Sequence, residues 1–390
     1  MVIDGEAPWV DIPQREEVAD MIQVDISNVW GQISLPDLLA VEQDTALAHA
    51  ALPRHQSLTE QELHRIQTAA EGIRGDSALC VAVGRGLGTK AAQAAVSLLA
   101  PEHGDILVFA GDSFSTRRWN VLMNTLEGKD FSLIVQPEGD LEAGLAFREL
   151  RWMLERKYGT EEAGQRIYLA GDDLESPLEK IARESGWQRF SAAGGTLLTM
   201  AAAGIDIGQI CQGAEENRED WDLRSFENPA WLYCAVRTVL NRRGRNLENL
   251  RLSEPEEALG RLWQGLFTSE KGALPLVGTA AGGENVFDTV LTFTLPGKPL
   301  TLGRDWADPE GLNALEGKTL QEVQEQALQA ALEGRIDRGI PVLSMDCGQM
   351  DARTFGGLLA FWNLCRGICA GLENPESCRV PEAQESPEQE

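Results

Sequence analysis

The residues best suited to chemistry stand in two loops, each of which follows a short apolar run and opens a helical pattern. The first loop is Gly84–Lys90 (GRGLGTK) and the second is Gly111–Arg118 (GDSFSTRR). Glycine lets a backbone come close to an anion, a helix start offers unpaired N–H groups, and hydroxyl and guanidinium groups donate to phosphate. The loops therefore predict an anion site. Its expected phosphate-binding residues are Gly84, Arg85, Gly86, Ser113, Ser115, Thr116 and Arg117.

Both loops also have a purely structural interpretation. A lone GxGxG run is often only a tight turn between a strand and a helix. Asp112 and the serines after it are typical of a helix N-cap followed by an exposed basic turn. Asp112 also counts against phosphate, because it places a carboxylate where a dianion would sit. From the residues alone, the two interpretations stay open.

The charge of the chain narrows the partners. It has 390 residues, with 34 basic and 61 acidic side chains and a formal net charge of −27. Such a field repels nucleic acid and anionic membrane surfaces, so neither is expected as a partner. It also repels a phosphorylated metabolite unless a local cluster of donors overcomes it. No apolar run is expected to approach the roughly 18–20 residues of a membrane span, and the acidic N-terminus does not resemble a signal peptide.

The cysteines indicate a cytoplasmic protein without a metal or cofactor. Seven Cys are scattered from Cys80 to Cys378, which favours buried, reduced thiols. Cys365 and Cys369 lie one turn apart on an apolar helical pattern, where a place in the core outweighs a metal pair. The chain has no CxxC and no HExxH pattern.

Short β-rich runs alternate with longer helical patterns, which predicts βαβ units and parallel sheets. Ligands then bind at the carboxyl ends of the strands, where both loops fall. The expected strands are Leu79–Val83, Ile106–Phe109, Leu133–Val135, Ile167–Ala170, Leu250–Leu252, Leu274–Val277, Val290–Phe293 and Pro341–Ser344. The expected helices are Thr89–Leu99, Ser115–Leu126, Leu141–Lys157, Pro177–Glu184, Pro229–Arg242, Pro255–Phe267, Leu320–Leu332 and Ala352–Gly371.

Several dispersed segments resemble the glucose-6-phosphate isomerase family. LCVAVGRGLG resembles its Gly-Ile-Gly-Gly-Ser-x-Leu-Gly turn, and VFAGDSFSTRRW resembles its phosphate loop. LLTMAAAGIDIGQICQGA, ENPAWLYCAVRTVLNRRGRNLENL and MDARTFGGLLAFW resemble further family segments, in the family's order. The resemblance covers roughly residues 31–385.

The resemblance implies an α/β fold with two sugar-isomerase domains, each a three-layer αβα sandwich with a parallel sheet. The expected division is an N-terminal helical segment (1–57), a first domain (58–190), a second domain (191–373) and an acidic tail (374–390). The implied activity is interconversion of glucose 6-phosphate and fructose 6-phosphate, in glycolysis and gluconeogenesis. A phosphosugar or another small anion is then the expected ligand. A homodimer is also expected, held by apolar helices such as Leu358–Gly371.

The family's catalytic positions are poorly kept. Its Glu base falls at Ser269, with Glu270 one residue late, and its Arg is matched by Arg189. Its phosphate-loop Lys is Asp112, and its C-terminal Lys is Glu385. The segment that carries its His is short and contains none; the four His of the chain are His49, His55, His64 and His103. Glu270 and Arg189 are therefore the only catalytic candidates, and an exposed loop Glu and a helix-capping Arg are their structural alternatives.

Two functions follow from the sequence. One is a divergent phosphosugar isomerase that works through Glu270 and Arg189. The other is a non-catalytic relative that binds a phosphosugar or serves as a dimeric scaffold. Each lost acid/base group removes roughly 10²–10⁴-fold in rate, which favours a degenerate active site with little activity.

Overall fold

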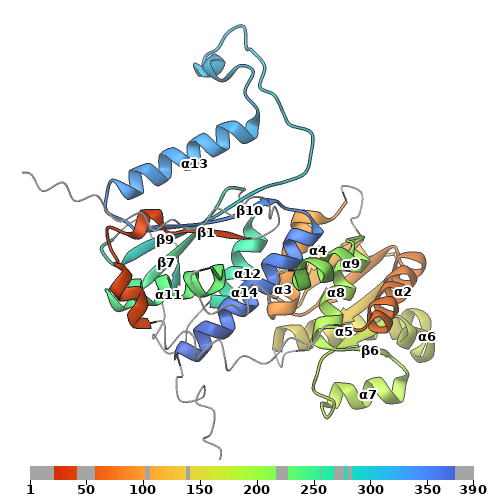
Figure 1. Ribbon diagram of the computed structural model, residues 1–390. Coiled ribbons are helices and arrows are strands. Elements are labelled where there is room, and N and C mark those ends of the chain that lie inside the picture. The colour runs from red at the N-terminus through yellow and green to blue at the C-terminus, as the bar shows by residue number, and fades with distance from the viewer. Residues whose placement is uncertain are drawn as a thin grey trace, which may run out of the picture.

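The computed structural model describes residues 22–41, 58–101, 106–137, 141–216, 227–254, 256–267, 276–278 and 283–373. Two five-stranded sheets, each with helices on both faces, form the chain (Figure 1). The first sheet has the order β3-β2-β4-β5-β6 and is wholly parallel. Its strands are β2 (Leu79–Val83), β3 (Leu107–Ala110), β4 (Phe131–Val135), β5 (Ile167–Ala170) and β6 (Gln188–Phe190).

Alternation along the first sheet sends side chains into two separate cores. Cys80, Ile134 and Tyr168 face one group of helices, while Val81, Leu133 and Ile167 face the other. The helices on the first face are α2 (Glu60–Asp76), α3 (Leu87–Leu99) and α8 (Ala192–Ala202). Those on the second face are α4 (Thr116–Leu126), α5 (Leu141–Tyr158), α6 (Thr160–Gln165) and α7 (Pro177–Ser185).

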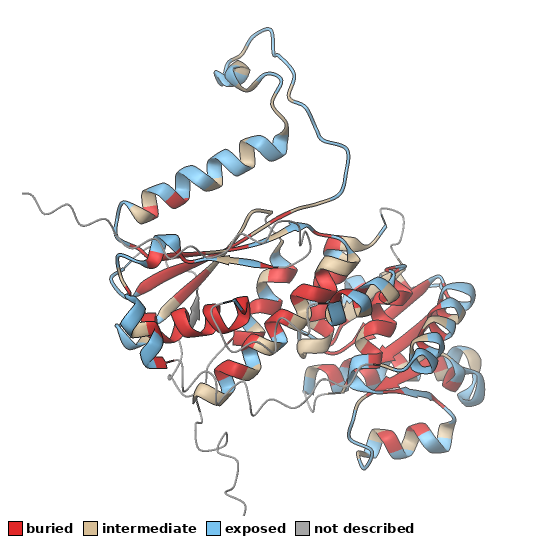
Figure 2. Cartoon of the chain, viewed as in Figure 1, coloured by how far each residue is buried: buried red, intermediate tan, exposed pale blue. Residues whose placement is uncertain are grey.

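The second sheet has the order β1-β10-β9-β7-β8, with only β1 antiparallel. Its strands are β1 (Gln23–Asp25), β7 (Leu247–Leu252), β8 (Leu276–Gly278), β9 (Val286–Thr294) and β10 (Val342–Gln349). One face packs on α11 (Pro229–Arg242), α12 (Glu257–Phe267) and α14 (Ala352–Glu373). The other carries α13 (Leu320–Ile336), which touches the sheet through a small cluster and is otherwise largely exposed (Figure 2).

One continuous apolar core joins the two halves, because helices of both sheets contribute to it. Helix α3 of the first half packs on α12 of the second, and α9 (Ile207–Glu216) packs along α14. Two glycines make the second contact close. A Cβ on Gly213 would lie 1.8 Å from the Arg353 carbonyl oxygen, and one on Gly356 would lie 2.0 Å from the Ile210 carbonyl oxygen. Backbone therefore meets backbone where α9 crosses α14.

The expected fold class is confirmed, and all sixteen expected elements occur. These sixteen ranges did not include β1, β6, α2, α6, α8 and α9. The N-terminal segment is not simply helical, since residues 22–41 contain β1, a 3-10 turn at Ser27–Val29 and helical residues 35–41. Helix α8, which begins just after residue 190, covers the first sheet by packing on α2 and α3. The proposed domain limits stay predictions.

Helix α14 corrects two expectations. Among the described residues, Ala352–Leu372 is apolar and long enough to cross a membrane by length and composition, which the sequence was not expected to contain. Half of its apolar window is buried inside the protein, as in the core helix of a folded domain. Leu358, Phe361 and Cys365 are fully buried in the same chain, so this apolar face is not available to a second subunit.

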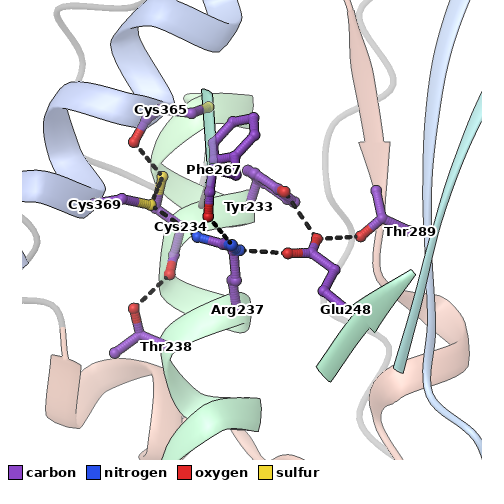
Figure 3. Close-up of polar contacts among 9 residues, drawn as sticks. All are labelled: Tyr233, Cys234, Arg237, Thr238, Glu248, Phe267, Thr289, Cys365 and Cys369. Atoms are coloured by element: carbon purple, nitrogen blue, oxygen red, sulfur yellow. Dashed lines mark hydrogen bonds and ion pairs between the residues drawn. The ribbon is translucent and has the colours of Figure 1, made fainter. Parts of the chain in front are cut away.

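A buried ion pair lies at the centre of the second half (Figure 3). Arg237 of α11 donates from Nε to Glu248 of β7 at 2.5 Å, and both side chains are fully buried. Tyr233 and Thr289 donate their hydroxyls to the same carboxylate at 2.8 and 2.6 Å. Arg237 also donates to the Phe267 carbonyl oxygen, at 3.4 Å, and to Cys369 Sγ, at 3.5 Å. The pair therefore ties α11, α12 and α14 to β7 and β9.

Replacing Arg237 by Met should lower the free energy of unfolding by about 3–5 kcal/mol, because it leaves the Glu248 carboxylate buried without a counter-charge. Urea unfolding measures the loss. The control is Arg261→Met, which breaks an exposed helical pair with Glu257 and should cost less than about 1 kcal/mol. Adding Glu248→Leu to Arg237→Met should recover part of the loss. Equal costs for the two single variants would contradict the prediction.

Candidate functional site

The carboxyl ends of β2, β3 and β4 meet at one edge of the first sheet. Val83 is level with Ala110 of β3 and with Val135 of β4. The Gly84 amide donates to the Ala110 carbonyl at 3.1 Å, and the Gln136 amide donates to the Val83 carbonyl at 2.9 Å. The structure therefore brings the two loops predicted from the sequence side by side, together with a third loop after β4.

The loop after β2 and the first turn of α3 pack closely around two glycines. A Cβ on Gly84 would lie 2.4 Å from Thr89 Oγ1, and one on Gly88 would lie 2.5 Å from Thr196 Oγ1. Helix α3 begins at an N-cap glycine, Gly86, which supplies no side-chain hydrogen bond. The first N–H groups of α3 therefore lack a side-chain cap and face the sheet edge, as anion-binding helix starts do.

The loop after β3 largely satisfies itself. Ser113 Oγ accepts from the Ser115 amide at 3.0 Å, and Ser115 Oγ accepts from the Arg118 amide at 3.4 Å. Asp112 pairs with Arg118 at 2.9 Å. Thr116 and Arg117 are exposed. Helix α4 therefore has the serine N-cap of the structural interpretation, whereas α3 lacks a side-chain cap.

Arg85 does not stand alone at this edge. Its Nη1 lies 2.9 Å from Glu142 Oε1, in the first turn of α5. The two side chains are 42% and 21% exposed, so this pair is partly shielded from solvent. An incoming anion must therefore compete with Glu142 for the Arg85 guanidinium.

Gln136 is a site residue that the sequence patterns missed. It follows β4 directly, is 8% exposed, and accepts at Oε1 from Thr89 Oγ1 at 3.0 Å. Its Nε2 is buried and has no hydrogen-bond partner among the described residues. A Cβ on Gly195 would lie 3.4 Å from that nitrogen, which places the amide between the first turns of α3 and α8. A polar residue directly after the apolar run FSLIV is the signal that could have found it.

Of the two catalytic candidates, the structure describes only Arg189, and it is not brought to these loops. Arg189 lies on β6, the far edge strand, and pairs with Glu179 Oε1 at 2.5 Å. Glu179 is 6% exposed and also pairs with Arg183 at 3.1 Å, so it anchors α7 to β6. Glu270 lies outside the described residues, as does the C-terminal tail from residue 374.

Imidazole and metal chemistry have little support in the described part of the chain. His64 is exposed on α2, and the other three His fall outside it. No group of three His, Cys, Asp or Glu side chains among the described residues could hold a metal ion.

The sequence is similar to those of glucose-6-phosphate isomerases over most of its length. A glucose-6-phosphate isomerase of Bacillus cereus (strain AH187) is 32% identical over 345 residues, covering 78% of this chain and 77% of that protein. One from Alkaliphilus metalliredigens (strain QYMF) is 29% identical over 407 residues, covering 90% of each. No protein-family model matches the chain.

Solved structures agree on the fold. A hypothetical protein from Thermus thermophilus superposes with a TM-score of 0.77 at 15% identity, covering 93% of this chain and 97% of that one. A glucose-6-phosphate isomerase from Chlamydia trachomatis superposes with a TM-score of 0.60 at 15% identity, covering 85% and 73%. One wholly parallel sheet and one largely parallel sheet, each covered by helices, make this an α/β protein with the fold of these structures. The chain belongs to the glucose-6-phosphate isomerase family.

Replacing Gly195 by Ala should lower the free energy of unfolding by about 1–3 kcal/mol, because the new Cβ would lie 2.0 Å from Ala170 Cβ in a packed core. The matched control is Gly144→Ala in α5, where nothing lies within 4 Å. That change should stabilise by about 0.5–1 kcal/mol. Urea unfolding of both variants measures the difference, and a neutral Gly195→Ala would show that α8 can move away from β5.

Proposed function

We propose that this family member binds a small phosphorylated anion and has little or no isomerase activity. The observation that carries the proposal is that Arg189, the expected catalytic cation, and Arg85, an expected phosphate-binding residue, are both paired with a carboxylate. Arg85 is held by Glu142 and Arg189 by Glu179. An isomerase needs a cation that is available to an enediolate and groups that move protons.

The loss of rate should be large. The family's base position is occupied by Ser269, and the segment that should carry its His has none. Because each acid/base group contributes roughly 10²–10⁴-fold, losing two or three removes many decades. The alternative, a divergent isomerase that uses Glu270 and Arg189, would require Arg189 to leave Glu179.

Turnover of fructose 6-phosphate should be undetectable, or several orders of magnitude below an ordinary enzyme. A coupled assay that detects glucose 6-phosphate measures it on the purified chain. The control is a family member with the usual His, Glu and Lys in the same assay. A turnover number in the common range of about 1–10³ s⁻¹ would overturn the proposal.

The ligand site that we propose is the α3 start together with Gln136. The first N–H groups of α3 lack a side-chain cap, and the buried Gln136 Nε2 is a second donor without a partner in the described chain. Ser113, Thr116 and Arg117 lie on the neighbouring loop and supply further donors. Glu142 acts against this set, because it neutralises Arg85 and adds to the chain's negative field.

Glu142→Gln should therefore tighten binding of a phosphosugar or inorganic phosphate by about tenfold, since releasing one charged hydrogen-bonded partner is worth roughly 1.5 kcal/mol. Arg85→Ala should weaken it. Isothermal titration calorimetry measures both. The matched control is Glu149→Gln on the same helix, which removes the same charge beside Arg148 but away from the sheet edge.

Two outcomes would count against this site. The first is that neither wild type nor Glu142→Gln binds either anion at millimolar concentration. The second is that Glu142→Gln and Glu149→Gln change the affinity equally. The effect of Glu142 would then come only from its contribution to the net charge and not from its contact with Arg85.

We also propose a homodimer, formed by the arm between β9 and α13 (residues 295–319). The arm extends away from both sheets (Figure 1). Trp306 is 96% exposed and Leu300 is 63% exposed. Exposed apolar side chains of this size, gathered on one extension, are typical of a protein–protein contact.

Six unpaired cysteines in the described chain support a cytoplasmic location.

Light scattering at micromolar concentration should report a dimer, and Trp306→Glu should shift it to a monomer. The reason is that a carboxylate in place of Trp306 would have to be buried in the contact. Trp152→Glu is the control, since Trp152 is a half-exposed tryptophan that lies on α5, away from the arm. A monomeric wild-type chain would exclude the dimer.

A further inference from the structure

A cavity with two arginines on its wall lies between the N-terminal segment and the end of α11. It has a volume of about 310 Å³ and is lined by Gln32, Leu240, Arg243 and Arg245. Gln32 comes from the N-terminal segment, and the other three come from the end of α11 and the turn after it. We propose that this cavity, with Arg243 and Arg245 on its wall, binds a tetrahedral oxyanion, either inorganic phosphate or a phosphate monoester.

The guanidiniums keep donors to spare. Arg243 donates from Nη1 to the Gln32 carbonyl at 2.6 Å and from Nη2 to Asp37 Oδ2 at 2.7 Å. Arg245 donates from Nη1 to the Val286 carbonyl at 3.4 Å. Its Nη2 donates to Gln32 Oε1 at 3.1 Å and to the Gly339 carbonyl at 3.2 Å. A guanidinium has about five N–H donors, so three remain on Arg243 and two on Arg245.

The two arginines of the cavity wall have only one carboxylate partner between them in the described residues. Hydrogen bonds from Ser34, and then from Arg243, lower the pKa of Asp37 to about 2. Asp37 is therefore ionised at neutral pH and neutralises one of the two guanidiniums. Arg245 has only neutral oxygen partners in the described part of the chain. One partly buried positive charge is thus left over at a cavity, although the chain carries 61 acidic side chains.

Clamping the N-terminal segment is a structural role that these arginines also perform. That role accounts for the bonds to Gln32 and Asp37, but it does not call for two guanidiniums beside an open cavity. Like charges repel, and an anion between them converts the repulsion into charge-assisted hydrogen bonds. The planar fork of an Arg side chain matches two oxygens of a phosphate.

The test separates this cavity from the sheet-edge site. Inorganic phosphate is titrated by calorimetry into wild type, Arg85→Ala and Arg245→Gln, with chloride held constant. Arg245→Gln should weaken binding at the cavity by at least about tenfold, because it removes the unbalanced charge, while Arg85→Ala leaves that binding event unchanged. Arg261→Gln is the control, since Arg261 is exposed and pairs with Glu257 away from the cavity.

A second variant covers the case in which Arg245→Gln loosens the N-terminal segment. Asp37→Asn removes the only carboxylate that pairs with the two arginines in the described residues, so it should tighten phosphate binding. Phosphate should also raise the melting temperature of wild type and of Asp37→Asn more than that of Arg245→Gln. Phosphate binding that survives Arg245→Gln unchanged, or that weakens in Asp37→Asn, would overturn the proposal, whatever happens at the sheet edge.

Discussion

The second half of the molecule depends on the Arg237–Glu248 pair. Burying two charges has a large desolvation free energy. The attraction within the pair and the hydrogen bonds from Tyr233 and Thr289 to the carboxylate offset it. These directional hydrogen bonds fix the position of α11 relative to β7 and β9. Apolar packing alone is not directional and would fix it less strictly. The same guanidinium reaches the last carbonyl of α12, so the position at which that helix ends is fixed from inside the core.

The fold was predictable where chain pattern and burial coincide. Strand β2 and helix α11 match their expected bounds, because an apolar run of strand length and an Asn-Pro helix start are strong local signals. Strand β1 has only three residues and pairs antiparallel with β10, more than 300 positions away, so local sequence contains little trace of it. Helix α8 is apolar on nearly all sides, which hides its period.

The sequence predicted where the candidate site lies, but not which carboxylates pair with its arginines. Strand ends and glycines located the edge correctly, because parallel strands bring their carboxyl ends together. Charge partners come from elsewhere in the chain: Glu142 for Arg85, and Glu179 for Arg189. A sequence shows which side chains are cations, but it does not show which of them the fold has already neutralised. That difference is what favours the proposal of a binding protein over that of a working isomerase.

The crossing of α9 and α14 has a mechanical consequence. Glycines let the two backbones touch there, so neither helix can slide or tilt without a clash between main-chain atoms. A shared core runs through the same contact, so the described parts of the two halves meet without a separate interface at which one could swing against the other. The two halves should therefore unfold as one cooperative unit. Adjustment to a ligand at the sheet edge should therefore come from its loops and not from a movement of one half against the other.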